Sequence, residues 1–345
     1  MHALILAGGE GMRLRPLTAN RPKPLVEFMG RPFAQGLLRR LADVGCHAAT
    51  FLVGADPRPF AGLCAAARAA GVDVTVLPER RPLDTAGAVR NLVSRGGTTG
   101  PVLVCNGDIL TDLDYGALLR THQRAGTAAT VALTRVDDTS NYGVVVTDPR
   151  GRVLRFVEKP PRGAATVDTV NAGTYVLSPG AFDRFPGSGR LSFEREVFPL
   201  LVAAGDLAAS VSAAYWLDIG TPQRYLAGHR AVLEGHCAWP TAEEIRPGPP
   251  GSASVVDDTA VVDPEAVLGP GAVVGAGCLI AAGATVRHAV LHARVRVEVD
   301  AVVDGAVLAP DVVVGARALV GPGSVVADGV RVPDGTVVAA GTPAG

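Results

Sequence analysis

Short apolar runs alternate with amphipathic stretches along residues 1–235. Four of the apolar runs have the length of buried strands, at residues 2–8, 48–54, 72–78 and 101–108. Three stretches between them space their apolar residues as helices do, at residues 32–45, 59–71 and 85–95. This alternation predicts an α/β domain with a doubly wound, mostly parallel, Rossmann-like sheet. Ligands of such sheets bind beyond the carboxyl ends of the strands, so the loops there are where a site is expected.

The pattern changes after a stretch rich in proline and glycine, residues 236–250, which predicts a linker. Beyond it, aliphatic residues recur every six positions, at Val256, Val262, Leu268, Val274, Ile280 and Val286. Small residues follow the first five of these by four positions, at Ala260, Ala266, Ala272, Cys278 and Ala284. The period resumes in a shifted phase, with Arg296 as its one break, at Val290, Val302, Leu308, Val314, Val320, Val326, Val332 and Val338.

A six-residue repeat of this kind predicts a parallel β-helix, because each coil of three repeats can bury its aliphatic residues only against stacked neighbours. The repeat resembles that of the hexapeptide, left-handed β-helices. We therefore expect a first domain at 1–235, a linker at 236–250 and a left-handed parallel β-helix at 251–345.

Composition and charge narrow the class of protein. A hydrophobic content of 48% with 19% charged residues is that of an ordered, soluble chain. The formal net charge of −1 gives no reason to expect nucleic-acid binding. The first residues lack the basic start of a signal peptide, and no run reaches the ~18 apolar residues of a membrane span. We expect a cytoplasmic protein with reduced cysteines and no membrane partner.

Lysine is rare in this chain, which has 30 arginines but only two lysines, Lys23 and Lys159. Arginine suits forked contacts, whereas a compact ammonium group reaches a phosphoryl group as a point charge. Lys23 lies between two prolines in "RPKPL", and Lys159 precedes two prolines in "VEKPP". Two solvated surface lysines are the alternative interpretation.

A glycine-rich loop follows the first predicted strand, in "LAGGEGMRLRPLT" at residues 6–18. Gly8, Gly9 and Gly11 would let the backbone approach a phosphate closely, and Arg13 and Arg15 follow at once. By itself such a cluster is equally typical of a tight strand–helix turn. The spacing fits neither the P-loop nor the dinucleotide fingerprint.

The chain resembles the sugar-1-phosphate nucleotidyltransferases, also called NDP-sugar pyrophosphorylases. The resemblance rests on the loop at 8–18, on Pro22-Lys23-Pro24, and on further motifs in family order at 83–89, 104–110, 156–160, 171–179, 193–201 and 215–226. Together these motifs cover the first domain. The amino-acid sequences of the last two motifs, together with the β-helix that follows the first domain, are most similar to those of the mannose-1-phosphate guanylyltransferases.

This resemblance implies that a sugar 1-phosphate attacks the α-phosphate of a nucleoside triphosphate in line and expels pyrophosphate. Because both reactants are anions, neutralising charge and positioning them are the main tasks. The resemblance assigns Mg²⁺ to Asp108 and Asp218, although either aspartate alone is also typical of a turn. It places Lys23 on the triphosphate and Lys159 on the sugar phosphate. The expected catalytic residues are Arg13, Lys23, Asp108 and Asp218.

Two binding groups follow from the same motifs. The nucleotide group is Leu6, Ala7, Gly8, Gly9, Gly11, Met12, Arg13, Lys23, Glu79, Pro82, Asp84, Thr85, Ala86, Gly87, Asn106 and Asp108. The sugar-phosphate group is Gly143, Glu158, Lys159, Asn171, Gly173 and Asp218. In isolation, "VEKP" and "NAG" would be interpreted as a strand end and a turn.

Two residues bear on the choice of substrates. A carboxylate accepts well from the adjacent N1–H and N2–H₂ donors of guanine. Relatives that bind thymidine or uridine nucleotides tend to have glutamine where this chain has Glu79, so Glu79 favours GTP. The alternative is that Glu79 is a solvated acid in a loop. Asp84 stands where the family usually has glycine, and we expect its carboxylate to face the base, the ribose or solvent. Mannose 1-phosphate is the expected sugar, with a heptose, glucose or cyclitol 1-phosphate as alternatives.

Two other classes of protein remain open. Hexapeptide β-helices often carry acyltransferases with a catalytic histidine, and His288 and His292 lie at the phase break of the repeat. Such histidines also cap or bend a coil. A non-catalytic regulatory homologue is the second alternative, but it would require a damaged site. For the β-helix we expect an interaction role that makes a homo-oligomer.

Overall fold

The computed structural model describes residues 1–69, 71–94, 96, 98, 100–240, 246–247, 253–341 and 343–344. The chain forms two compact units, each discontinuous in sequence. The first unit is Met1–Gly9 with Leu37–Trp216, and the second is Glu10–Gly36 with Leu217–Gly345. Of the linker expected at 236–250, residues 241–245 and 248–250 lie outside the described residues. The domain boundaries expected from the sequence concern parts of the chain that fold independently, and they stay a prediction.

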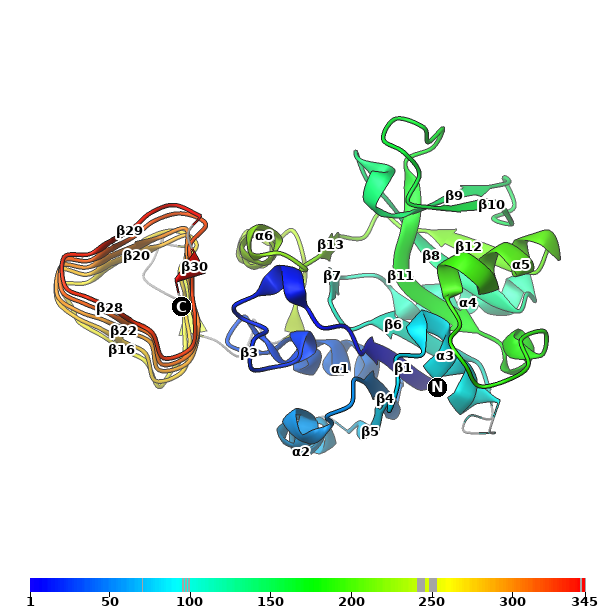
Figure 1. Ribbon diagram of the computed structural model, residues 1–345, viewed down its shortest axis with the longest axis horizontal. Coiled ribbons are helices and arrows are strands. Elements are labelled where there is room, and N and C mark those ends of the chain that lie inside the picture. Colours follow the sequence, from blue (N-terminus) through cyan, green and yellow to red (C-terminus); the bar gives the residue numbers. More distant parts are fainter. Residues whose placement is uncertain are drawn as a thin grey trace. The chain divides into compact units, whose positions relative to one another are not determined.

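The first unit is built on a sheet with a parallel core (Figure 1). Its parallel strands run in the order β5-β4-β1-β6: β1 (His2–Ala7), β4 (Ala48–Val53), β5 (Asp73–Pro78) and β6 (Val102–Asn106). The helices between them are α1 (Phe33–Asp43), α2 (Ala61–Ala69) and α3 (Asp84–Val93). These are the strands and helices that the hydrophobic pattern predicts, so the α/β fold class is confirmed.

Antiparallel strands extend this core beyond β6. They are β8 (Ala129–Arg135), β9 (Gly143–Thr147), β10 (Val153–Glu158) and β11 (Thr169–Leu177), with β12 (Leu207–Val211) parallel to β8. The remaining elements of this part are β7 (Ile109–Thr111), α4 (Tyr115–Ala125) and α5 (Phe198–Ala203). A large apolar core joins the two halves of the sheet and includes Leu4, Val104, Val131 and Tyr175. The five cysteines, all of which lie in described parts of the chain, form no disulfide.

No helix within the described ranges is both long and apolar enough to cross a bilayer.

The second unit contains a solenoid of very short parallel strands, which Figure 1 shows end-on as stacked triangular coils. We call its three sheets the first, second and third solenoid sheets. The first contains the parallel strands β15 (Val255–Val256), β18 (Val273–Val274), β21 (Val290–Leu291), β24 (Val307–Leu308), β27 (Val325–Val326) and β30 (Pro343–Ala344), with β14 (Arg246–Pro247) antiparallel to β15. The second contains β16 (Val261–Val262), β19 (Leu279–Ile280), β22 (Arg296–Val297), β25 (Val313–Val314) and β28 (Arg331–Val332). The third contains β17 (Val267–Leu268), β20 (Thr285–Arg287), β23 (Val302–Asp304), β26 (Leu319–Val320) and β29 (Val337–Val338). The parallel β-helix expected from the repeat is confirmed.

The phase of the repeat is corrected between residues 286 and 308. The buried core of the solenoid takes Leu291, Val297 and Val303, not Val290, Arg296 and Val302 as the sequence pattern indicated. Consecutive strand residues face opposite sides, so the expected positions are the outward neighbours of the inward ones. Arg296, the supposed break, is simply an exposed outward residue beside Val297. The spacing of inward residues shortens from six to five twice, and His288 lies in the first shortened step with a φ of 49°.

An aromatic cluster lies beside the solenoid within the second unit. It joins the hairpin of β2 (Glu27–Phe28) and β3 (Arg31–Pro32) to α6 (Pro222–Leu233) and to Trp239. Trp239 stacks on Phe33 with 4.7 Å between ring centroids and meets Phe28 edge-on at 5.6 Å. Trp239 is buried, although the sequence pattern placed it in the linker. A Cβ atom built on Gly36 would lie 2.5 Å from two ring carbons of Trp239, so glycine is required there.

The variant Gly36→Ala tests this packing. Alanine is normally better than glycine inside a helix by about 1 kcal/mol, but here the added methyl overlaps Trp239. We expect the free energy of unfolding to fall by about 1–3 kcal/mol in a denaturant titration. The matched control is Gly62→Ala in α2, where nothing lies within 4 Å of a built Cβ atom. The control should gain about 0.5–1 kcal/mol, and a gain in both variants would contradict the packing.

Two buried histidines of the second unit are neutral. His229 accepts from the Met29 amide (3.1 Å) through Nε2, and its Nδ1 donates to the Tyr225 carbonyl (3.0 Å). His292 Nε2 lies 2.9 Å from Tyr225 Oη, and that hydroxyl donates to the Glu27 carbonyl. His292 therefore donates through Nε2 and carries no proton on Nδ1. Burial lowers the pKa of His229 to about 4 and, together with the Arg21 charge, that of His292 to about 3.

These shifts predict a loss of stability in mild acid. A histidine whose folded pKa lies below the unfolded value near 6.5 takes up its proton more readily in the unfolded chain. The stabilisation is therefore complete above pH 6.5 and is lost as the pH falls toward the folded pKa. We expect the thermal unfolding midpoint to drop more between pH 7 and pH 5 in the wild type than in His292→Gln. Glu27, whose pKa burial raises, is present in both proteins and cancels in this comparison. Equal drops would contradict a neutral buried His292.

Candidate active site

The glycine-rich loop leaves β1 with its backbone exposed. Leu6 and Ala7 are the last residues of β1, and Gly8 and Gly9 follow them as exposed residues in the first unit. Gly11 has a φ of 62°, a conformation that favours glycine, and it precedes the 3₁₀ turn Met12–Leu14. Thr18 Oγ1 donates to the Gly11 carbonyl at 2.8 Å and holds the turn closed. Because the loop backbone is fixed yet exposed, it can serve as a phosphate cradle.

Asp218 lies among three cationic side chains in the second unit. It is the last residue of β13 (Trp216–Asp218), and Lys23 Nζ lies 3.4 Å from its Oδ1. Its Oδ2 lies 3.5 Å from an Nη atom of Arg13 and 3.5 Å from one of Arg224. Three cations around one carboxylate leave an excess of positive charge, which is the electrostatic requirement for binding a polyphosphate.

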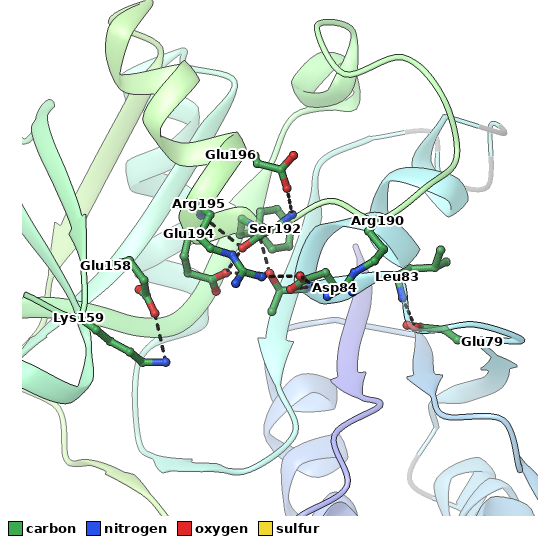
Figure 2. Close-up of polar contacts among 12 residues, drawn as sticks. Glu79, Leu83, Asp84, Glu158, Lys159, Arg190, Ser192, Glu194, Arg195 and Glu196 are labelled. Carbon is green, nitrogen blue, oxygen red and sulfur yellow. Dashed lines mark hydrogen bonds and ion pairs between the residues drawn. The ribbon is translucent and has the colours of Figure 1, made fainter.

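The two lysines differ in their surroundings. The side chain of Lys23 is only 10% exposed, whereas that of Lys159 is 64% exposed. A buried ammonium group beside a carboxylate is not a solvated surface lysine, so that interpretation fails for Lys23. Lys159 lies at the surface of the first unit, with Nζ 3.3 Å from Glu158 Oε1 (Figure 2).

Gly220 and Arg224 belong to the same cluster, although the motif analysis singled out neither. A Cβ atom on Gly220 would lie 2.7 Å from Asp218 Oδ1 and 3.1 Å from Lys23 Nζ, so a side chain there would displace the cluster. Arg224 lies in the first turn of α6, which Thr221 caps by accepting from the Arg224 amide at 3.3 Å. Both residues lie in the motif "YWLDIGTPQRYL". The sequence feature that could have identified them is a capped helix that starts soon after Asp218.

Asn106 ends β6 and Asp108 follows it in the first unit, as the sequence predicts. Asn106 is the last residue of the strand, and Asp108 lies in the turn before β7. Gly173 lies in an irregular stretch of β11 with a φ of 71°, where a Cβ atom would come within 2.5 Å of Asn106 Nδ2. Asn171 Oδ1 accepts from the Gly173 amide at 2.9 Å. The structure therefore brings Asn106, Asn171 and Gly173 together.

Gly143 allows Glu158 to approach the opposite strand. The two residues are direct partners in the β9–β10 register, and a Cβ atom on Gly143 would lie 3.0 Å from Glu158 Oε2. Lys159 then takes a φ of 46°, and its amide donates to the Tyr142 carbonyl at 3.1 Å. Within the described residues 1–240, only Met29, Asp84 and Lys159 combine a side chain with a positive φ. Two of these three are candidate site residues, and strained backbone is typical of functional sites.

Glu79 follows β5 directly and is half-buried in the first unit. Its Oε2 accepts from the Leu83 amide at 3.0 Å, as Figure 2 shows. Gly8 lies nearby, because a Cβ atom built on it would be 3.9 Å from Glu79 Oε1. Partial burial, with a smaller contribution from the Asp84 charge, raises the pKa of Glu79. A half-buried carboxylate with one oxygen beside the glycine-rich loop is not a solvated loop acid.

Asp84 turns toward two arginines rather than toward solvent, which corrects one of the outcomes expected from the sequence. Its Oδ2 lies 2.5 Å from an Nη atom of Arg195 and 3.4 Å from one of Arg190 (Figure 2). Its Oδ1 accepts from the Thr85 amide at 2.9 Å, and its φ is 65°. The two guanidinium groups neutralise the Asp84 carboxylate, which is absent from relatives that have glycine at this position.

The rest of the motif at 82–87 attaches α3 to a neighbouring segment. Thr85 Oγ1 donates to Glu194 Oε2 at 2.8 Å. The amides of Ala86 and Gly87 both donate to the Leu191 carbonyl, at 2.9 and 3.1 Å. Pro82 is exposed, whereas Ala86 is fully buried. Contact with a nucleotide at these positions stays a prediction.

The donor chemistry of the site fits a divalent cation that is completed by phosphate oxygens. Asp218 offers carboxylate oxygens, and its cationic neighbours lie at 3.4–3.5 Å, beyond ordinary hydrogen-bond length. Among the residues that the structure describes, no group of three or more acidic, histidine or cysteine side chains could enclose a metal by itself. Mg²⁺ commonly takes one or two carboxylates plus substrate phosphates. Contact of Mg²⁺ with Asp108 and Asp218 stays a prediction from the resemblance.

Comparison with known proteins agrees with the motifs. The nucleotidyl transferase family model matches residues 2–235, and the GMPPB C-terminal domain model matches residues 251–342. The mannose-1-phosphate guanylyltransferase of Mycobacterium tuberculosis is 37% identical over 238 residues, which are 68% of this chain and 65% of that protein. The mannose-1-phosphate guanyltransferase of Pichia angusta is 38% identical over 234 residues, which are 66% of this chain and 63% of that protein. These matches therefore span less than two thirds of each relative.

A solved structure shows the same similarity in three dimensions. HddC from Yersinia pseudotuberculosis aligns with a TM-score of 0.57 and 29% sequence identity. The alignment covers 66% of this chain and 97% of that one. With a family model that spans residues 2–235 and relatives that share more than a third of the aligned residues, the chain belongs to the nucleotidyl transferase family.

Proposed function

We propose that this chain joins GTP to mannose 1-phosphate, forming GDP-mannose and pyrophosphate. The observation that carries the proposal is the cluster of Lys23, Arg13 and Arg224 around Asp218. Its excess positive charge suits a triphosphate that is losing pyrophosphate, where negative charge develops on the leaving group. The similarity to two guanylyltransferases for mannose 1-phosphate supports the choice of substrates.

The residues of the chain divide the work of the reaction. Arg13 and Lys23 neutralise the triphosphate, and the backbone of residues 8–12 cradles its phosphates. Glu158, Asn171 and the 173 backbone position the sugar, while Lys159 holds its phosphate in line with the α-phosphate. Asp108 and Asp218 would hold Mg²⁺, which would neutralise charge on the phosphoryl oxygens. No proton transfer by the protein is required, because the attacking phosphate is already anionic.

The acyltransferase alternative finds no support in the two histidines. His292 is buried and bonded to Tyr225, so an acyl acceptor cannot reach its Nε2. His288 occupies a turn where the repeat shortens, in keeping with a structural role. A homo-oligomer formed through the β-helix stays a prediction.

The variants Lys23→Arg and Asp218→Asn test the reaction. Arginine is too large for the buried position of Lys23, and asparagine removes the charge that holds three cations. We expect each to lower kcat for Mg²⁺-dependent pyrophosphate release by about 100-fold or more, with the fold intact by circular dichroism. The control is Asp56→Asn, which alters an exposed ion pair with Arg58 and should keep full activity. Full activity in either test variant would overturn the assignment of this cluster.

The variant Glu79→Gln tests the choice of base. Glutamine can donate to a carbonyl of uracil or thymine, whereas the carboxylate only accepts from guanine N1–H and N2–H₂. We expect the ratio of kcat/KM for GTP over UTP or dTTP to fall by about 10-fold or more. An unchanged ratio would contradict a contact between Glu79 and the base. The same assay with mannose, heptose, glucose and cyclitol 1-phosphates identifies the sugar. The ion pairs of Asp84 bear on this choice, because Asp84 is where the chain departs from the family pattern.

A further inference from the structure

One face of the solenoid is covered while the other two are open. The outward residues Val273, Val290, Val307 and Val325 of the first solenoid sheet are all buried. Their counterparts in the other two sheets include Val261, Val267 and Val337, which are exposed. Val307 is 0% and Val337 is 66% exposed, although both are outward valines of the same repeat. A segment of the second unit therefore packs on the first solenoid sheet.

The hydrogen bonds identify residues 21–31, the segment that carries Lys23, as part of this cover. Arg21 forms an ion pair with Asp328. Glu27 Oε2 accepts from the Ala293 amide at 3.2 Å. Arg31 Nη1 lies 3.1 Å from Asp257 Oδ2.

The solenoid partners of this segment share one edge. Asp257 follows β15, Ala293 follows β21 and Asp328 follows β27, and these strands belong to the first solenoid sheet. Because the strands are parallel and in register, their carboxyl ends align along one side of the stack. The segment is thus attached at three coils along a single edge.

Helix α6 is attached at the same edge. Tyr225 Oη donates to the Glu27 carbonyl and meets His292 Nε2 at 2.9 Å. Arg224, the neighbour of Tyr225 on this helix, reaches Asp218. Both elements that bring a buried or partly buried cation to Asp218 are therefore tied to the solenoid, one through Arg21, Glu27 and Arg31 and the other through Tyr225.

We propose that the β-helix is the platform that holds the Lys23 segment and α6 in their catalytic arrangement, with Asp257, His292 and Asp328 as positioning residues for nucleotidyl transfer. This inference rests on the proposed function and gives the solenoid a role within one chain, beyond any role in assembly. None of the three touches a reacting group; they act by restricting where Lys23 and Arg224 can lie. Misplacing a catalytic group by about 1 Å can lower a rate by about 100-fold.

The test is the double variant Asp257→Asn/Asp328→Asn, which removes both ion pairs while keeping the size of each side chain. A single partly exposed pair contributes little, so the two are changed together. We expect kcat for pyrophosphate release to fall by about tenfold or more, with a smaller change in KM for GTP. Amide hydrogen exchange in residues 17–31 should become faster. A purely structural role in the solenoid would not speed exchange in that segment alone.

The matched control is Asp304→Asn, which breaks an ion pair of 3.0 Å with Arg287 on the third solenoid sheet. It should leave both kcat and exchange in residues 17–31 unchanged. If this double variant does not fold, Arg21→Gln/Arg31→Gln removes the same two ion pairs from the segment side and should show the same two effects. A folded variant with wild-type kcat and wild-type exchange overturns the platform. If the wild type releases no pyrophosphate with any substrate pair, the proposed function fails, and the exchange data alone decide the platform.

Discussion

The cation cluster around Asp218 depends on keeping the ammonium group of Lys23 buried beside the carboxylate of Asp218. Burying a charge without a partner is strongly unfavourable, so Lys23 can occupy its position only while Asp218 lies within reach. Asp218 in turn gathers Arg13 and Arg224, and Gly220 leaves the space that the three cations need. One ion pair thereby constrains a loop, a strand end and the start of a helix.

The solenoid satisfies this constraint through the regularity of its repeat. Each coil ends its strand of the first solenoid sheet at the same edge, so residues far apart in the chain, such as Asp257 and Asp328, lie along one line. The same six-residue repeat that fills the core therefore also produces a straight row of attachment points. An irregular domain would need a separate solution for each contact.

Much of the fold could be predicted because it follows from local periodicity. The four strands and three helices that the hydrophobic pattern predicts within residues 1–108, and the β-helix, all appear, whereas the β2–β3 hairpin was not predicted. The antiparallel strands after β6 were not assigned, and the solenoid phase between 286 and 308 was wrong. A two-residue strand has one inward and one outward residue, so an aliphatic at both positions, as in β21, hides which one faces the core.

The sequence by itself determined the family, the glycine-rich loop and the special standing of Lys23, because rare residues in ordered motifs need no coordinates to be recognised. Only the tertiary structure decided that Lys23 is buried and Lys159 is not, that Arg195 and Arg190 neutralise Asp84, and that Arg224 joins Asp218. It also decided that Trp239 belongs to a core rather than a linker. The reason is physical: burial and charge pairing depend on which distant segments meet, and local sequence does not record that meeting.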